Sequence, residues 1–333
     1  MGYPIAPLNN PENIGLYAQA GARELYMGFY DPSWTAMFGP HCDINRMSGF
    51  GAEANACTLP ELLQVIPRAK AAGCDFYVTF NAATYSAAME PWLESYFWQL
   101  ACDGADGVIL GGPEFIDLAH SCGLKAVAST MCGIYNSQIA QLYIEWGADR
   151  LILPRDLSLE ELCTIIGENP SVEYEVFLMR NGCVFSDSHC LGMHGHRRGA
   201  LCGEMRQAGR AFTCKTGCTK KLWHTSDLRR DVYHQYACGL CALWDLEQAA
   251  NIAYKVVGRG DKPNAIAEDI ALVAENIEIA RRCTSRNEYL SQMRRNPYEN
   301  QICAKGLNCY YPELWDGRRI EPTTRTPSSV QMA

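Results

Sequence analysis

The sequence predicts an α/β fold, specifically a TIM-like (β/α) barrel with a cysteine-rich insertion after the seventh strand. Short apolar runs alternate with amphipathic helical segments from the N-terminus onward. Most of these runs are apolar almost throughout, as expected for parallel strands that are buried on both faces. No glycine-rich dinucleotide fingerprint follows the first run, which disfavours an open nucleotide-binding sheet. The regular strand–helix repetition therefore favours a closed barrel.

Seven strands are expected from the apolar runs, with an eighth candidate near the C-terminal end of the repetition. In chain order they cover residues 3–8, 24–29, 75–81, 107–112, 125–130, 150–155, 173–180 and 254–259. Helices are expected at 11–21, 58–73, 89–104, 113–123, 135–147, 158–167 and 264–285, the last of which closes the barrel. Thr58 with Glu61 three residues later is a capping-box signature at one helix start. Residues 30–57 form a long insert between the second strand and this helix.

The domain organisation follows from this repetition. One barrel is expected over residues 1–290, including a cysteine-rich segment at 181–241, and residues 291–333 form a C-terminal extension whose end, from Pro322, is expected to be disordered. No apolar run reaches the roughly 18 residues that a membrane helix needs, so no membrane span is expected. The N-terminus has neither a basic region nor an apolar one, which predicts a cytoplasmic protein.

Charge is distributed unevenly along the chain. The net charge of −8 disfavours broad nucleic-acid binding. Residues 180–230, however, hold ten Lys or Arg against three Asp or Glu, a net charge of +7, so the remainder carries −15. This basic segment could stabilise a negatively charged cofactor, attract an anionic substrate, or be a solvated loop.

Seven of the seventeen cysteines fall between residues 183 and 241. They are Cys183, Cys190, Cys202, Cys214, Cys218, Cys238 and Cys241. Clustered thiols in a reducing compartment indicate Fe–S or zinc chemistry, because thiolates are soft metal ligands. The spacings do not match the paired CxxC motifs of a zinc ribbon. We favour a four-cysteine [4Fe–4S] site over structural zinc and over buried free cysteines.

Barrel position alone selects a set of candidate site residues. In (β/α) barrels, chemistry occurs where strands end and βα loops begin. That rule selects Asn81, Gly111, Gly112, Ser129, Thr130, Arg155, Arg180, Asn181 and Arg259, and it places Cys183 just beyond strand seven. Each has a structural alternative, since Ser and Asn often only satisfy loop backbone, and Arg155 could pair with Asp156 or Glu160.

Three stretches, 128–162, 175–207 and 238–260, resemble family 32 of the peptidases of unassigned mechanism, the collagenase-like peptidases. The resemblance spans about residues 3–290. Better-understood relatives in that family are oxygen-independent hydroxylases of ubiquinone precursors, tRNA and rRNA. The resemblance implies a barrel, a four-cysteine [4Fe–4S] cluster, and prephenate as the oxygen donor.

The resemblance also implies roles residue by residue. It gives Cys183, Cys190, Cys202 and Cys241 as cluster ligands, with Cys238 or the Cys214/Cys218 pair as alternatives. Catalytic positions would be Asn81, Ser129, Thr130 and Arg155, and substrate-binding positions Asn55, Asn136 and Arg259. Its place after the seventh strand adds Arg180 to the expected substrate-binding residues. We expect the three arginines to bind carboxylates of a prephenate-like dianion, since guanidinium matches carboxylate bidentately.

Three departures from the family pattern stand out. Asp156 follows Arg155 where the family has Glu, and Val257 replaces an acidic residue in the KVVGR motif. A second cysteine that many relatives carry just after Cys202 is also missing. The loss at Val257 weakens any acid–base role there and is consistent with a different substrate or a weaker catalyst.

The expected function is an Fe–S-dependent, oxygen-independent hydroxylation of a small molecule, for which an aromatic compound is one candidate, with prephenate as co-substrate. An RNA-base hydroxylase is one alternative, and a non-catalytic Fe–S accessory subunit of a paired hydroxylase is another. A paralogous subunit or a second copy of the chain is thus a candidate partner, while no membrane partner is expected. Proteolysis is disfavoured because neither HExxH nor GxSxG occurs.

Overall fold

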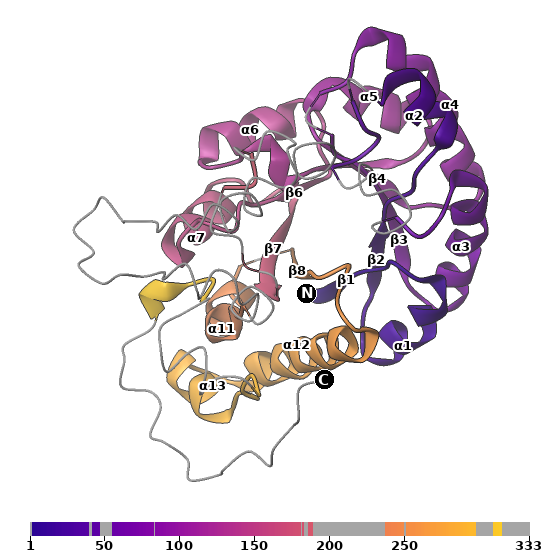
Figure 1. The fold of residues 1–333 in the computed structure, drawn as a ribbon. Helices are drawn as coiled ribbons and strands as arrows, with labels where there is room; N and C mark the ends of the chain where they lie inside the picture. Colours follow the sequence, from indigo (N-terminus) through magenta and orange to yellow (C-terminus); the bar gives the residue numbers. More distant parts are fainter. Residues whose placement is uncertain are drawn as a thin grey trace, which may run out of the picture.

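Eight parallel strands form a closed barrel in chain order, from β1 to β8. In the computed structural model, the described residues are 2–39, 42–46, 55–82, 84–180, 182, 186–188, 237–249, 251–297 and 309–314. Figure 1 shows the ring of strands with the helices packed around its outside. The predicted (β/α) barrel is therefore confirmed. Most of the cysteine-rich insertion lies outside the described residues and stays a prediction.

All eight expected strands are present, and each ends one to three residues earlier than predicted. They are β1 (Tyr3–Pro7), β2 (Glu24–Met27), β3 (Asp75–Phe80), β4 (Gly107–Leu110), β5 (Lys125–Ala128), β6 (Arg150–Ile152), β7 (Glu173–Met179) and β8 (Ile252–Val256). The apolar runs continue past the last ladder pairs because the residues that follow turn into the rim while staying buried. Pro154, which has no amide hydrogen to donate, lies just beyond the end of the short strand β6.

The predicted helices are also present. They are α1 (Ile14–Gln19), α3 (Leu59–Ala71), α4 (Glu90–Cys102), α5 (Ile116–Ser121), α6 (Ser137–Glu145), α7 (Leu159–Glu168) and α12 (Pro263–Arg282). The capping box forms as expected: the Thr58 amide donates to Glu61 Oε2 at 2.7 Å. Among the described residues, three further α-helices are α2 (Pro32–Phe38), within the insert, α11 (Leu243–Glu247) and α13 (Arg286–Gln292).

Residues 237–239 and 309–311 return to the end of β7. Cys238 bridges Met179 in an antiparallel sense and Cys309 in a parallel sense. The hydroxyl of Tyr310 donates to the Arg180 carbonyl at 2.6 Å, and that of Tyr311 donates to the Phe177 carbonyl at 3.2 Å. Part of the predicted C-terminal extension therefore packs directly on the barrel, beside the point where the cysteine-rich segment leaves it.

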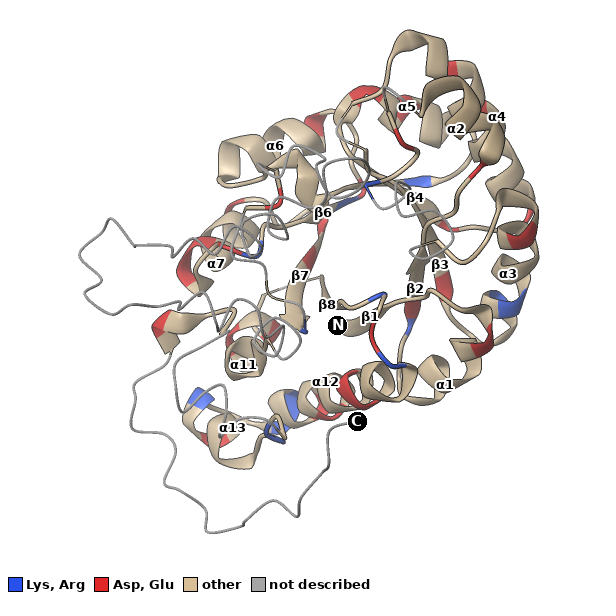
Figure 2. Cartoon of the chain, in the orientation of Figure 1, with Lys and Arg blue, Asp and Glu red and all other residues tan. Residues whose placement is uncertain are grey.

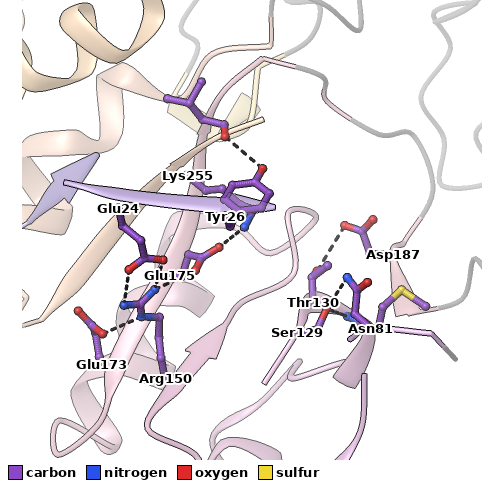
Figure 3. Close-up of polar contacts among 12 residues, drawn as sticks. Glu24, Tyr26, Asn81, Ser129, Thr130, Arg150, Glu173, Glu175, Asp187 and Lys255 are labelled. Carbon is purple, nitrogen blue, oxygen red and sulfur yellow. Dashed lines mark hydrogen bonds and ion pairs between the residues drawn. The ribbon is translucent and has the colours of Figure 1, made fainter. Parts of the chain in front are cut away.

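The amino-terminal half of the barrel interior contains buried ion pairs. Arg150, only 2% exposed, contacts both carboxylate oxygens of Glu24 at 2.7 Å and donates to Glu173 Oε2 at 2.6 Å. Lys255 pairs with Glu175 one layer further along the axis. Figure 2 shows charged residues of both signs on the strands themselves, and Figure 3 shows this network beside the polar group at the other end. Because Glu24, Arg150 and Glu173 begin their strands, the network fills the end of the barrel opposite to the expected site.

Candidate active site at the barrel mouth

The carboxyl ends of β3, β4 and β5 lie in register and bring predicted site residues into one row. Phe80 pairs with Leu110, and Leu110 pairs with Ala128. The residues that follow are Asn81, Gly111 and Ser129. A Cβ at Gly111 would lie 2.2 Å from the Ala82 carbonyl oxygen, so only glycine allows the two strand ends to approach this closely. The Nδ2 of Asn81 accordingly lies 3.5 Å from the Ser129 hydroxyl, which accepts its hydrogen bond.

These side chains also support the backbone. Asn81 Oδ1 accepts from the Arg46 amide at 3.3 Å, and the Ser129 hydroxyl accepts from the Met131 amide at 3.3 Å. Both residues are buried, at 8% and 1% exposure. Asn81 and Ser129 therefore have the structural role that the sequence left open, since both accept hydrogen bonds from loop amides, and both also lie at the barrel mouth.

Asp187 is the central charged group of the mouth. Its Oδ2 accepts from Arg155 Nε at 2.7 Å and from the Thr130 hydroxyl at 3.3 Å, and its Oδ1 accepts from Arg46 Nη1 at 3.1 Å. The Asp187 side chain is 3% exposed. Burial would raise the pKa of this carboxyl, but the two guanidinium groups hold the pKa below its ordinary value. Asp187 is therefore ionised and joins the insert, β5, β6 and the cysteine-rich segment.

Further contacts surround the Asp187 cluster, by which we mean Asp187, Arg46, Arg155 and Thr130. The Arg155 guanidinium lies 4.2 Å from the centre of the Phe177 ring, a cation–π distance. Tyr135, in the loop before α6, shares hydrogen bonds with Ser186 and Ser188 on either side of Asp187. Residues 186–188 are thus held at the mouth by the loops after β5 and β6.

Asn55 and Arg259 lie at the mouth beside residues of β2 and of the loop that follows it. Asn55 is 1% exposed, and its Oδ1 accepts from Asn45 Nδ2 at 3.4 Å. The Arg259 guanidinium lies 5.6 Å from the centre of the Tyr26 ring. In the part of the chain that is described, neither Asn55 Nδ2 nor Arg259 Nη1 has a hydrogen-bond partner, although both atoms are buried.

Two predicted substrate-binding residues are engaged elsewhere. Asn136 is exposed and caps α6, where its Oδ1 accepts from the Ile139 amide at 2.9 Å. Arg180 pairs with Asp269 of α12 and lies 3.5 Å from Asp261. Its backbone adopts φ of 70°, a left-handed conformation that its many contacts maintain. The structure therefore brings Asn81, Ser129, Thr130 and Arg155 together and places Asn55 and Arg259 beside β2, but it directs the Arg180 guanidinium to α12.

Two residues of the mouth, Arg46 and Asp187, were not predicted from the sequence. Asp187 is one of only three acidic residues in the basic segment, which is a signal that could have found it. Arg46 lies in the insert after β2 and carries no pattern of its own. Its role depends on a contact across 141 residues of sequence.

The predicted cluster ligands fall largely outside the described part of the chain. Cys183, Cys190 and Cys202 are not among the described residues, whereas Cys241 and Cys238 are. Within the described ranges, no group of three or more His, Cys, Asp or Glu is arranged to hold a metal ion. The four-cysteine cluster accordingly stays a prediction.

A closed (β/α) barrel with buried arginines, a carboxylate and hydroxyls at its carboxyl-terminal mouth has the arrangement of an enzyme of the barrel class. Comparison with known families is specific: the profile of Peptidase family U32 matches residues 9–311. The chain belongs to this family, which confirms the resemblance seen in the sequence.

Curated relatives include proteins that are named for RNA hydroxylation. The chain is 24% identical to the tRNA hydroxylation protein P1 of Bacillus subtilis over 56% of its own length and 40% of that protein. It is 25% identical to the 23S rRNA 5-hydroxycytidine synthase of Escherichia coli, over 72% of the chain and 38% of the relative. An uncharacterised protease of Methanocaldococcus jannaschii is 23% identical over 72% of the chain and 59% of that protein.

The chain thus spans about two fifths of the length of the RNA-hydroxylation relatives it matches. Among solved structures, the U32 peptidase Mk0906 aligns over 78% of this chain and 94% of its own, with a TM-score of 0.47 and 13% identity. In the described residues, no helix combines the length and apolar character that crossing a bilayer requires.

Proposed function

We propose that this chain is the barrel of an RNA-base hydroxylase that works without molecular oxygen and takes its oxygen from prephenate. The observation that carries the proposal is the mouth itself. Two guanidinium groups, Arg46 and Arg155, meet a hydroxyl and the carboxylate of Asp187 there, and the Arg259 guanidinium lies at the same mouth over the Tyr26 ring. Arginine matches carboxylate and phosphate groups bidentately, so the cations at the mouth favour an anionic ligand.

RNA is the better-supported acceptor. Two of the three relatives named above are a tRNA and an rRNA hydroxylation protein, the third is an uncharacterised protease, and none is named for a small molecule. The basic segment at 180–230, with its charge of +7, leaves the barrel at the carboxyl end of β7 and would suit a phosphate backbone. The small aromatic acceptor expected from the sequence has no comparable support.

The proposal includes a [4Fe–4S] cluster on Cys183, Cys190, Cys202 and Cys241. Arg180 donates its amide to the Ala237 carbonyl at 2.6 Å, and Gly239 donates its amide to the Leu178 carbonyl at 2.8 Å. The chain between them therefore leaves and returns at the end of β7. In the sequence, Cys183 follows Arg180 by three residues and Cys190 follows Asp187 by three, and a span of three residues reaches at most about 11 Å, which supports the proposal. When bound, the cluster would supply the electron transfer that oxygen-independent hydroxylation needs.

Anaerobic reconstitution tests the function directly. The full chain, purified anaerobically with iron and sulfide, is incubated with prephenate and with unmodified tRNA or rRNA, and nucleosides are analysed by mass spectrometry. The expected product is a nucleoside with one added oxygen that requires prephenate. Hydroxylation of a small aromatic acceptor but not of RNA would overturn the choice of substrate.

A second arm addresses the accessory-subunit alternative. If product forms only after a paralogous U32 protein is added, the chain supports catalysis rather than performing it. Binding to RNA should weaken steeply as salt rises, since phosphate contacts release counterions. RNA binding that is absent, or insensitive to salt, would remove RNA as the acceptor.

A further inference from the structure

The glycine that follows β2 creates a polar niche in the barrel mouth. A Cβ at Gly28 would lie 2.4 Å from Asn55 Oδ1, 2.9 Å from Asn45 Nδ2 and 2.9 Å from Thr79 Oγ1. Any side chain at this position would displace these three polar groups. We call Gly28, Asn45, Asn55 and Thr79 the Gly28 niche. Three separate segments meet in it: the end of β2, the insert, and the inward face of β3.

The hydrogen bonds of the niche determine how the Asn55 amide is oriented. Asn45 Nδ2 donates to the Phe29 carbonyl at 3.1 Å and to Asn55 Oδ1 at 3.4 Å. Because Asn45 presents its NH2 group, Asn55 must turn its oxygen toward it and its own NH2 group away. In the described residues, Asn55 Nδ2 has no hydrogen-bond partner, and the residue is 1% exposed. A buried donor without an acceptor is unfavourable, so this position suits a ligand that brings one.

Arg259 faces the same side of the mouth. Its guanidinium lies over Tyr26, two residues before Gly28, and residues two apart along extended chain point the same way. Arg259 Nη1 is buried and has no hydrogen-bond partner among the described residues. Burial lowers the pKa of Arg259, and the nearby Arg46 lowers it further, as expected for a cation that lacks an anion.

The other charged groups nearby already have partners. Lys255 lies 3.8 Å from the centre of the Tyr26 ring and is paired with Glu175. Asp187, the acidic group of the mouth, accepts from Arg46, Arg155 and Thr130. Neither carboxylate is available to Arg259, so an anion at Arg259 has to come from outside the described part of the chain.

We propose that the Gly28 niche and Arg259 form an anion subsite for one carboxylate or phosphate group. Asn55 Nδ2 and Arg259 Nη1 both donate and cannot accept, so the ligand group must present acceptor oxygens, and the guanidinium selects a negative charge. This inference rests on the proposed function in one respect, namely that the substrate binds at the barrel mouth. The oxygen donor would supply a carboxylate and RNA would supply a phosphate. Both groups are anions with oxygen atoms that accept hydrogen bonds, which is what the subsite would bind.

The experiment measures binding rather than turnover, so that it is independent of hydroxylation. The full chain is titrated calorimetrically with prephenate, with inorganic phosphate and with a short RNA. Asn55→Asp replaces the Nδ2 donor of the niche with a carboxylate oxygen while keeping the shape of the side chain, and Arg259→Gln removes the cation. The matched controls are Asn287→Asp and Arg68→Gln, the same changes at exposed positions on α13 and α3.

We expect both niche variants to weaken binding of one ligand by at least about tenfold while the controls bind as the wild type does. Loss confined to prephenate assigns the subsite to a carboxylate, and loss confined to phosphate and RNA assigns it to a phosphate. Wild-type affinity for every ligand in both variants, or no binding by the wild type, overturns the subsite. Retained binding without hydroxylation would instead count against the proposed function.

Discussion

Asp187 accepts a hydrogen bond from Arg155 Nε at 2.7 Å, across 32 residues of sequence, and both side chains are largely buried. The contact joins the cysteine-rich segment to the end of β6. Arg46 approaches the same carboxylate from the insert after β2. One carboxylate therefore holds three separate parts of the mouth together.

Replacing this carboxylate should destabilise the fold. Asp187→Asn leaves Arg155 and Arg46 without their counter-charge in a buried setting, which should cost about 2–4 kcal/mol of unfolding free energy. Urea unfolding of the full chain measures the change. Asp117→Asn, at an exposed position on α5, is the control and should change stability by less than about 0.5 kcal/mol. A loss no larger than that of the control would show that the ion pairs contribute little.

The ion pairs of Asp187 with Arg155 and Arg46 should also make stability depend on pH in a defined direction. The folded-state pKa of Asp187 lies below its ordinary value, so its contribution is fully present above the unfolded pKa of about 4. It is lost as pH falls through the lower folded-state pKa. The stability difference between wild type and Asp187→Asn should thus be constant from about pH 5 to 7 and shrink below about pH 4. A difference that grows on acidification would contradict the assignment.

Arg180 should matter for stability rather than for ligand affinity. Its guanidinium pairs with Asp269, and burial raises the pKa of that carboxyl to about 6 even with Arg180 beside it. Arg180→Gln leaves Asp269 buried without its partner and should lower the unfolding free energy by about 2–4 kcal/mol. Prephenate affinity, measured on the folded variant, should stay within about threefold of wild type. A loss of prephenate affinity comparable to that of Arg259→Gln would show that Arg180 does contribute to ligand binding.

The ion pairs of Arg150 with Glu24 and Glu173 inside the barrel should be energetically coupled. Arg150→Met leaves the Glu24 carboxylate, which is 1% exposed, without its partner. The unfolding free energy should therefore fall by about 3–5 kcal/mol. Adding Glu24→Gln to the variant should recover part of that loss, because the isolated carboxylate is gone. Chemical denaturation of both single variants and the double variant gives the coupling. Strictly additive effects would mean that the two side chains do not interact energetically.

The proposed cluster predicts a selective effect of cysteine removal. Cys183→Ala and Cys241→Ala should each abolish the visible absorbance and the iron and sulfide content of anaerobically purified protein. Cys74→Ala is the matched control, because Cys74 is buried before β3, and it should retain both signals. An intact cluster in the Cys241 variant would move the fourth ligand to Cys238 or to the Cys214/Cys218 pair.

Much of the site could be predicted from the sequence, but only as positions. Asn81, Ser129, Thr130 and Arg155 are selected because they follow strand ends, and parallel strands in a closed barrel bring those ends to one rim. The same rule selects Arg180, since it follows β7. It cannot say that the left-handed turn at Arg180 directs the guanidinium toward α12, because that depends on where a helix about 80 residues later packs.

The sequence by itself determined the barrel, the order of its strands and the rim on which chemistry occurs, because apolar periodicity and strand–helix alternation are local patterns. The tertiary structure alone decided which groups at that rim are paired. Asp187 pairs with Arg46 and Arg155, whereas Asn55 Nδ2 and Arg259 Nη1 are buried donors without a partner among the described residues. These outcomes depend on strand register and barrel closure, which place residues more than 100 positions apart within hydrogen-bond distance, and no local pattern encodes such pairings.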